Sequence, residues 1–163
     1  MSKKIRTVSV KAKTAHSKEN IWDIAIDIKN WDKLIKFVKK IYMKDDVKEG
    51  AVFYDITAIL IIPGLVRHKI IEIEPNKKLY VEAYIPFNSG KMFQTISIKD
   101  LNGKREIEIE IKYYISFFIF DLIFGKILEH RLKDMIVSSL KNAQLTLDKK
   151  YNKDMSKLEI ITN

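Results

Sequence analysis

The chain has 163 residues, of which 47% are hydrophobic and 31% charged, as is typical of a single globular domain. It has no cysteine, which excludes disulfides and thiolate sites, and no run approaching the roughly 20 apolar residues of a membrane-spanning helix. The net charge is +9, and residues 1–50 hold 13 basic and 7 acidic side chains. Since the N-terminus also lacks the apolar core of a secretory signal, we expect a cytoplasmic protein. Few glycines and abundant lysine, glutamate and isoleucine are typical of a thermophile, and an AT-rich genome gives a similar bias.

The first elements in chain order are a strand and two short helices. Ile5–Lys13 alternates apolar and polar residues with the period of a half-buried strand. Ser17 is the candidate N-cap of a helix, and Asn30 that of a second one. The apolar positions expected to face the core are Ile21, Trp22, Ala25 and Ile26 on the first helix, and Trp31, Leu34 and Ile35 on the second. Helices this short must pack on a larger element to be stable.

A meander of six strands follows, separated by turns rich in glycine, proline and asparagine. Asn102-Gly103 is the strongest hairpin signal among these turns. In the last strand three glutamates alternate with isoleucines, which predicts one buried face and one solvated face. The predicted strands are Val38–Lys44, Ala51–Ile61, Val66–Glu74, Lys78–Ile85, Lys91–Lys99 and Arg105–Ile115.

From Phe118 to about Tyr151 the apolar residues recur at three- and four-residue steps, which predicts one long helix. We expect residues 1–151 to form the folded domain. The tail, residues 152–163, is mostly polar, and either it is disordered or it adds a short strand.

The order of elements and two local segments carry a family resemblance. Residues 17–24 (SKENIWDI), followed by Asp27 and Trp31, are similar to the opening of the START/polyketide-cyclase (SRPBCC) superfamily, which includes the birch-pollen allergen. Residues 70–79 resemble its central hairpin. The resemblance implies an α+β helix-grip fold: a curved seven-stranded antiparallel sheet, two short helices and a long C-terminal helix over an apolar cavity. Members include lipid carriers, coenzyme-Q-binding proteins, aromatase/cyclases and plant hormone receptors.

The strand and helix periods predict which side chains face this cavity. The alternative is a solid core without a pocket, because protein interiors are close-packed by default. The expected lining is Leu79, Val81, Ala83, Ile85, Met92, Gln94, Ile96, Ile107, Ile109, Ile111, Tyr113, Leu128, Leu132, Met135 and Ile136.

Three polar residues are candidates for holding a ligand head group: His68, Arg131 and Tyr113. A few placed polar groups orient a ligand in an otherwise apolar pocket. The alternative for each is an exposed or already hydrogen-bonded side chain. His16, His68 and His130 fall on separate elements without ligand spacing, so we expect no metal site. We assign no catalytic residue and no cofactor.

Three apolar segments fall at turns that share one end of such a meander, and we expect the short helices at that end too. Together they would form an exposed patch, such as a ligand entrance or a membrane contact. The alternative is that the strands and the long helix extend further, so that these residues belong to the core. The entrance candidates are Ile61, Ile62, Leu65, Phe87, Phe118 and Phe120.

These features favour a carrier for a small hydrophobic ligand, such as a fatty acid, a lipid or an isoprenoid-like molecule. One alternative is a cyclase- or dehydratase-type enzyme that uses the same pocket. Another is a protein-interaction module with residues 117–124 as its interface. We expect transient membrane contact, no nucleic-acid partner, and a monomer or homodimer.

Overall fold

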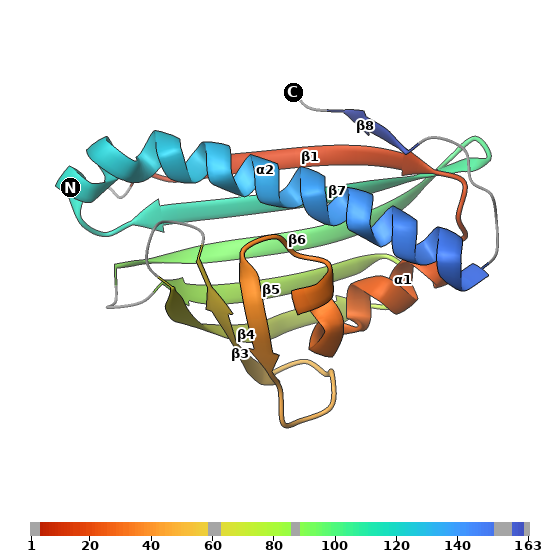
Figure 1. Cartoon of the computed structure of the whole chain (residues 1–163), viewed down its shortest axis with the longest axis horizontal. Helices are drawn as coiled ribbons and strands as arrows, with labels where there is room; N and C mark the ends of the chain where they lie inside the picture. The colour runs from red at the N-terminus through yellow and green to blue at the C-terminus, as the bar shows by residue number, and fades with distance from the viewer. Residues whose placement is uncertain (1–3, 59–62, 86–88, 152–157, 162–163) are drawn as a thin grey trace.

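The computed structural model describes residues 4–58, 63–85, 89–151 and 158–161, and within the long helix the side chains of residues 118–120 are not described. A curved antiparallel sheet wraps around one long helix (Figure 1). The strands are β1 (Arg6–Thr14), β2 (Val38–Tyr42), β3 (Val52–Thr57), β4 (Gly64–Glu74), β5 (Lys78–Ile85), β6 (Gly90–Leu101), β7 (Lys104–Ile115) and β8 (Glu159–Ile161). The helices are α1 (Lys18–Ile26), the short 3₁₀-helix η1 (Ile28–Lys33) and α2 (Phe118–Tyr151).

The sheet order is β2-β3-β4-β5-β6-β7-β1-β8, and this arrangement confirms the predicted α+β helix-grip class. The described residues form eight strands rather than seven, because Glu159–Ile161 in the C-terminal tail pairs with Lys11–Lys13 of β1. At the β6–β7 hairpin, Asn102 and Gly103 both have positive φ, as a type I′ turn requires.

The strand register places three strand ends together. Thr57 pairs with Gly64, and Gly90 pairs with both Ile85 and Ile115, so the ends of β3, β5 and β7 share one end of the sheet. This agrees with the end predicted for the three apolar segments.

The prediction that the short helices lie at that same end is wrong for α1. Because β1 runs antiparallel to β7, Thr14 pairs with Arg105 next to the β6–β7 hairpin, at the opposite end of the sheet. α1 begins there (Figure 1), and the Ser17 hydroxyl caps it by accepting a hydrogen bond from the Asn20 amide at 3.2 Å.

The first turns of α2 are fastened directly to the sheet. The Arg6 guanidinium binds both oxygens of Asp121, at 2.8 and 3.1 Å. The Tyr113 hydroxyl donates to the Gly125 carbonyl at 3.0 Å. Gly125 allows the Arg6 guanidinium to lie this close to the helix, because a Cβ at position 125 would be only 2.7 Å from it.

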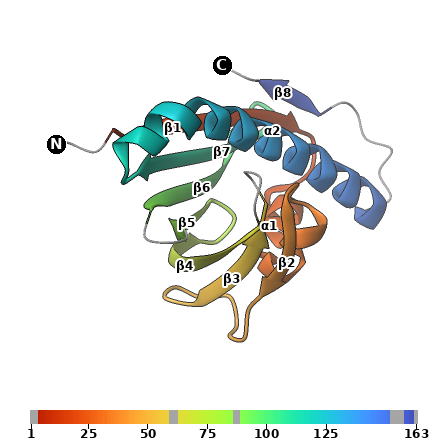
Figure 2. The same ribbon diagram turned by 60° about the vertical axis from the view of Figure 1, so that its left-hand side comes forward.

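The C-terminal half of α2 passes over α1 instead (Figure 2). The Asn142 side-chain amide donates to the Leu34 carbonyl at 2.8 Å, and the Tyr151 hydroxyl donates to Asp23 at 3.1 Å. The short helices therefore lie between this half of α2 and the sheet. In the described part of the chain, no helix is long and apolar enough to cross a membrane.

Candidate functional site

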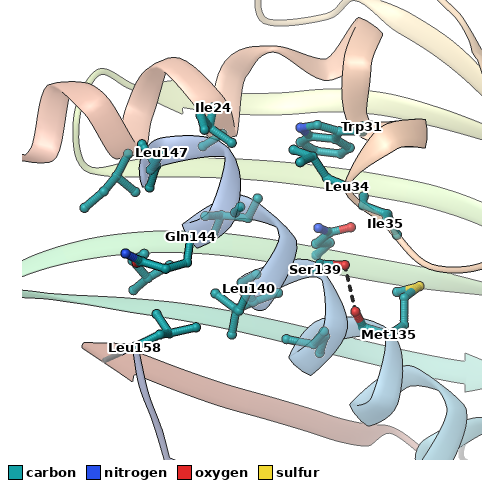
Figure 3. Close-up of a pocket in the computed structure, with 18 of the residues that line it drawn as sticks. Ile24, Trp31, Leu34, Ile35, Met135, Ser139, Leu140, Gln144, Leu147 and Leu158 are labelled. Carbon is teal, nitrogen blue, oxygen red and sulfur yellow. Dashed lines mark hydrogen bonds between the residues drawn. The ribbon is translucent and has the colours of Figure 1, made fainter. Parts of the chain in front are cut away.

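A cavity of about 80 Å³ lies beneath the C-terminal half of α2, between that helix, the short helices and the sheet (Figure 3). A space of that size has room for several water molecules. We call it the apolar cavity, because nearly all of its lining is aliphatic or aromatic. Its lining residues are Ile21, Ile24, Ala25, Trp31, Leu34, Ile35, Gln94, Ile96, Ile107, Ile109, Ile111, Met135, Ile136, Ser139, Leu140, Ala143, Gln144, Leu147 and Leu158.

Two of the polar side chains in this lining are engaged within the protein. The Ser139 hydroxyl donates to the Met135 carbonyl at 2.7 Å, as Figure 3 shows. The Gln144 side chain accepts from the Thr14 hydroxyl at 3.0 Å and donates to Asp148 at 2.9 Å. The surface offered to a ligand is therefore almost entirely hydrocarbon.

A second, smaller cavity of about 50 Å³ adjoins the first beneath Leu132. The two cavities share five lining residues: Trp31, Ile35, Gln94, Ile111 and Met135. Methionine is unbranched and adapts its rotamers readily, so Met135 is the most adaptable part of this shared lining. The second cavity is also lined by Val38, Asp55, Thr57, Val66, His68, Ala83, Met92 and Leu132.

The second cavity contains a buried histidine–aspartate pair. His68 on β4 and Asp55 on β3 are 8% and 6% exposed, and His68 Nε2 lies 2.9 Å from Asp55 Oδ2. The His68 ring stacks on Phe53, with ring centroids 4.5 Å apart and planes within 3°. Asp55 Oδ1 is buried and has no hydrogen-bond partner among the described residues. We call this the Asp55–His68 pair.

A second buried histidine has a similar partner but a different setting. His16, on the connection from β1 to α1, is 0% exposed, and its Nε2 lies 2.8 Å from Asp148 Oδ1 on α2. Asp148 also accepts from Gln144, so this network ties the β1–α1 connection to the C-terminal half of α2. His16 itself lines neither interior cavity.

The structure places the residues predicted to line a cavity in two groups. The first group borders one or both cavities: Ala83, Met92, Gln94, Ile96, Ile107, Ile109, Ile111, Leu132, Met135 and Ile136. The second group borders neither: Leu79, Val81, Tyr113 and Leu128 are buried core residues, and Ile85 is half-buried at the end of β5.

Of the three head-group candidates, only His68 borders an interior cavity. Arg131 is exposed, and its guanidinium lies 5.4 Å from the centre of the Phe37 ring. Tyr113 is fully buried, its hydroxyl is bound to the Gly125 carbonyl, and burial raises its pKa to about 12. Arg131 missed the cavity because it lies one helical position before Leu132, and 100° of rotation turns it outward.

The entrance candidates fall mostly outside the described side chains. Ile61, Ile62 and Phe87 lie outside the described residues, and the side chains of Phe118 and Phe120 are not described. Leu65, near the start of β4, is 57% exposed. Other large exposed apolar residues near the start of α2 are Phe117, Leu122, Ile123 and Ile127.

Sequence reasoning missed two parts of the lining. The inner faces of α1 and η1 were predicted to be apolar, but nothing in the sequence placed them against the C-terminal half of α2. Asp55 was missed because both faces of its strand carry apolar residues, with Phe53 on one side and Ile56 on the other. The sequence signal that could have identified Asp55 as buried is its position two residues after Phe53, because the two side chains share one face of the strand.

Charged groups elsewhere do not form a comparable site. Among the described residues, no cluster of three or more histidine, aspartate or glutamate side chains could hold a metal ion. A larger hollow of about 320 Å³ lies on the outer face of the sheet, where Lys78 binds Glu72 at 2.6 Å. That ion pair is partly exposed, so this hollow is a shallow feature of the surface rather than an interior site.

No protein-family model matches the sequence, and no curated protein matches it. Solved structures match the fold. The di-domain ARO/CYC StfQ from the steffimycin biosynthetic pathway has a TM-score of 0.77, with 11% identity over 91% of this chain and 52% of that chain. Ara h 8.0201 has a TM-score of 0.71 with 12% identity over 90% of this chain and 99% of that chain. A START superfamily protein from Mycobacterium smegmatis has a TM-score of 0.71 with 13% identity over 88% of this chain and 98% of that chain. The fold implied by the sequence resemblance is thereby confirmed.

Proposed function

We propose that this protein binds a small hydrophobic molecule in the two adjoining cavities and carries it between sites. The observation that supports this most is the almost wholly aliphatic and aromatic lining of the apolar cavity. Space left open in a close-packed interior sacrifices dispersion contacts, and an apolar ligand would restore them. Each Å² of apolar ligand surface removed from water contributes about 25 cal/mol.

A ligand longer than a few carbon atoms would occupy both cavities. Met135 and Ile35 stand between them, and a change of the Met135 rotamer would join the two spaces. Fatty-acid, lipid and isoprenoid-like chains have the flexible, narrow shape that such a joined cavity suits.

Exchange of the ligand would occur at the sheet end where β3, β5 and β7 terminate. Leu65 and Leu122 are 57% and 70% exposed there, and an apolar surface of this kind suits contact with a membrane or with an incoming ligand. The net charge of +9 would favour approach to an anionic membrane surface.

A second candidate is a cyclase- or dehydratase-type enzyme, and the Asp55–His68 pair favours it. A buried imidazole beside a carboxylate is suited to proton transfer. However, such chemistry normally uses several positioned titratable groups, whereas the Asp55–His68 pair is the one titratable cluster among the described residues that line the cavities. We therefore favour the carrier.

Native mass spectrometry of the purified protein tests the proposal, combined with solvent extraction of any bound molecule. We expect a mass adduct that disappears after extraction, and uptake of a fluorescent fatty acid or a neutral apolar dye by the extracted protein. Chelation with EDTA should not change that uptake. A protein that carries no adduct and takes up no apolar probe would contradict the proposal.

A further inference from the structure

We propose that the Asp55–His68 pair binds a hydroxyl group, so that the ligand is a neutral alcohol or phenol with an apolar body rather than a carboxylic acid. This inference rests on the proposed function and narrows its ligand class. It starts from one atom: Asp55 Oδ1 is buried in a residue that lines the second cavity, and it has no partner among the described residues.

The hydrogen-bonding capacity of the pair defines what it can accept. A carboxylate in its ionised form only accepts hydrogen bonds, and with that form of Asp55 the hydrogen between the two residues is carried by His68 Nε2. Asp55 Oδ1 therefore requires a donor. A buried acceptor without a partner is unfavourable, and a ligand hydroxyl that donates to it would remove that penalty.

The other ring nitrogen of His68 does not change the requirement for a donor at Asp55 Oδ1. It accepts a hydrogen bond when the imidazole is neutral and donates one when the imidazole is protonated. A hydroxyl carries one hydrogen, and Asp55 Oδ1 can accept it whether the imidazole is neutral or protonated. A ligand carboxylate matches neither state well, because it cannot donate to Asp55 and would bring a second negative charge beside it.

The surroundings leave room for a head group but not for a charged, hydrated one. Ala83, the cross-strand neighbour of His68 on β5, is small and lines the same cavity. Phe53 covers one face of the imidazole, and Trp31 packs edge-on against Phe53 with ring centroids 6.0 Å apart. From this position an apolar chain would extend past Met135 into the apolar cavity.

A set of compounds built on a ten-carbon chain tests the head group separately from the apolar body. n-Decanol, decyl methyl ether, decanoate and decylamine would each compete with the neutral dye phenylnaphthylamine for the extracted protein. We expect n-decanol to bind roughly ten-fold more tightly than the ether, which cannot donate, and more tightly than decanoate, because hydrogen bonds to charged groups are strong in a dry site.

Three variants locate the effect. Asp55→Asn should abolish the preference for n-decanol over the ether and raise the relative affinity for decanoate, since the negative charge is gone. Asp134→Asn is the matched control, because it makes the same substitution at an exposed carboxylate that lines neither cavity and should leave all four affinities in the same order. The double variant Asp55→Leu/His68→Leu removes both partners without leaving a buried charge, so it keeps the test open if Asp55→Asn does not fold.

The outcomes separate the two proposals. Tightest binding of decanoate or decylamine, or a preference for n-decanol that survives in both Asp55 variants, would overturn the hydroxyl site while leaving apolar binding intact. Failure of the wild-type protein to bind the dye or any of the four compounds would instead remove the proposed function, and the hydroxyl site with it.

Discussion

The two halves of α2 relate to the sheet in opposite ways. Its first turns lie directly on β1 and β7, fastened by the Arg6–Asp121 ion pair and by the Tyr113 hydroxyl on the Gly125 carbonyl. From Leu132 onward the inner face of the helix borders the two cavities, and α1 and η1 lie under it. We call these the fastened half and the open half.

The difference shows how a helix-grip protein combines stability with an empty interior. The fastened half uses a glycine, a partly buried ion pair and a buried tyrosine to bring the helix backbone close to the sheet. In the open half the same helix is supported at a distance by the short helices, which leaves space that a ligand can fill. Stability and binding should therefore respond to mutations in different halves of one helix.

The largest effect is expected at Leu132, where the two halves meet. Leu132 is fully buried, so Leu132→Ala should lower the free energy of unfolding by about 2–5 kcal/mol, measured by urea denaturation. Leu145→Ala, on the outer face of the same helix at 57% exposure, should change it by less than about 0.5 kcal/mol. Equal effects of the two substitutions would mean that the described rotation of α2 is wrong.

The ion pair of the fastened half should make stability depend on acid pH. Its hydrogen bonds from Arg6 lower the pKa of Asp121 in the folded protein. The resulting stabilisation is fully present above the unfolded-state pKa of about 3.9 and is lost as the pH falls through the lower folded-state pKa. Arg6→Met should therefore cost about 1.5–3 kcal/mol at neutral pH and much less in strong acid.

Lys36→Met is the control for that experiment. It removes a 2.7 Å ion pair to Asp134 on the same helix, but both of these side chains are well exposed. Exposed pairs contribute less than about 1 kcal/mol, so its effect should be small at every pH. A loss in Arg6→Met that stays constant from neutral to acid pH would contradict the role assigned to the ion pair.

A small-to-large pair of substitutions distinguishes filled space from open space. Ala12 on β1 is fully buried and borders neither cavity, so Ala12→Leu should cost about 1–3 kcal/mol through overpacking. Ala143 borders the apolar cavity, so Ala143→Leu should cost less than about 1 kcal/mol and should abolish uptake of an apolar dye. Ala143→Leu that unfolds the protein, or that binds the dye normally, would show that this space is not the binding site.

The fastened and open halves differ also in how far the sequence predicted them. Alternation along β7 and the helical period of α2 identified the buried faces of both elements, because each period depends only on local geometry. The sequence therefore predicted an inner helix face with Leu128, Leu132 and Ile136, and all three are buried. The hairpin at Asn102-Gly103 was equally local, since its backbone conformation requires those residue types.

What could not be predicted depends on long-range placement. The position of α1 follows from the antiparallel pairing of β1 with β7, which joins residues about a hundred positions apart. The Asp55–His68 pair depends on the cross-strand register of β3 and β4, and His68 alone gave no sign of its partner. Tyr113 and Arg131 show the same limit: a helical or strand period gives a direction, but not what a side chain meets there.

The smallest change in stability is expected at the proposed entrance. Leu65 and Leu122 are exposed at the sheet end where β3, β5 and β7 terminate, so Leu65→Ser/Leu122→Ser should alter the free energy of unfolding by less than about 0.5 kcal/mol per site. It should nevertheless slow transfer of a fluorescent apolar ligand from anionic vesicles, because less apolar surface contacts the bilayer.

Leu101→Ser/Leu145→Ser, which changes exposed leucines away from that end, is the control and should transfer at the wild-type rate. Equal transfer by both double variants would place the entrance elsewhere. Slower transfer by the first variant alone, at unchanged equilibrium affinity, would show that ligand exchange occurs at the fastened end of α2 although the ligand itself lies under the open half.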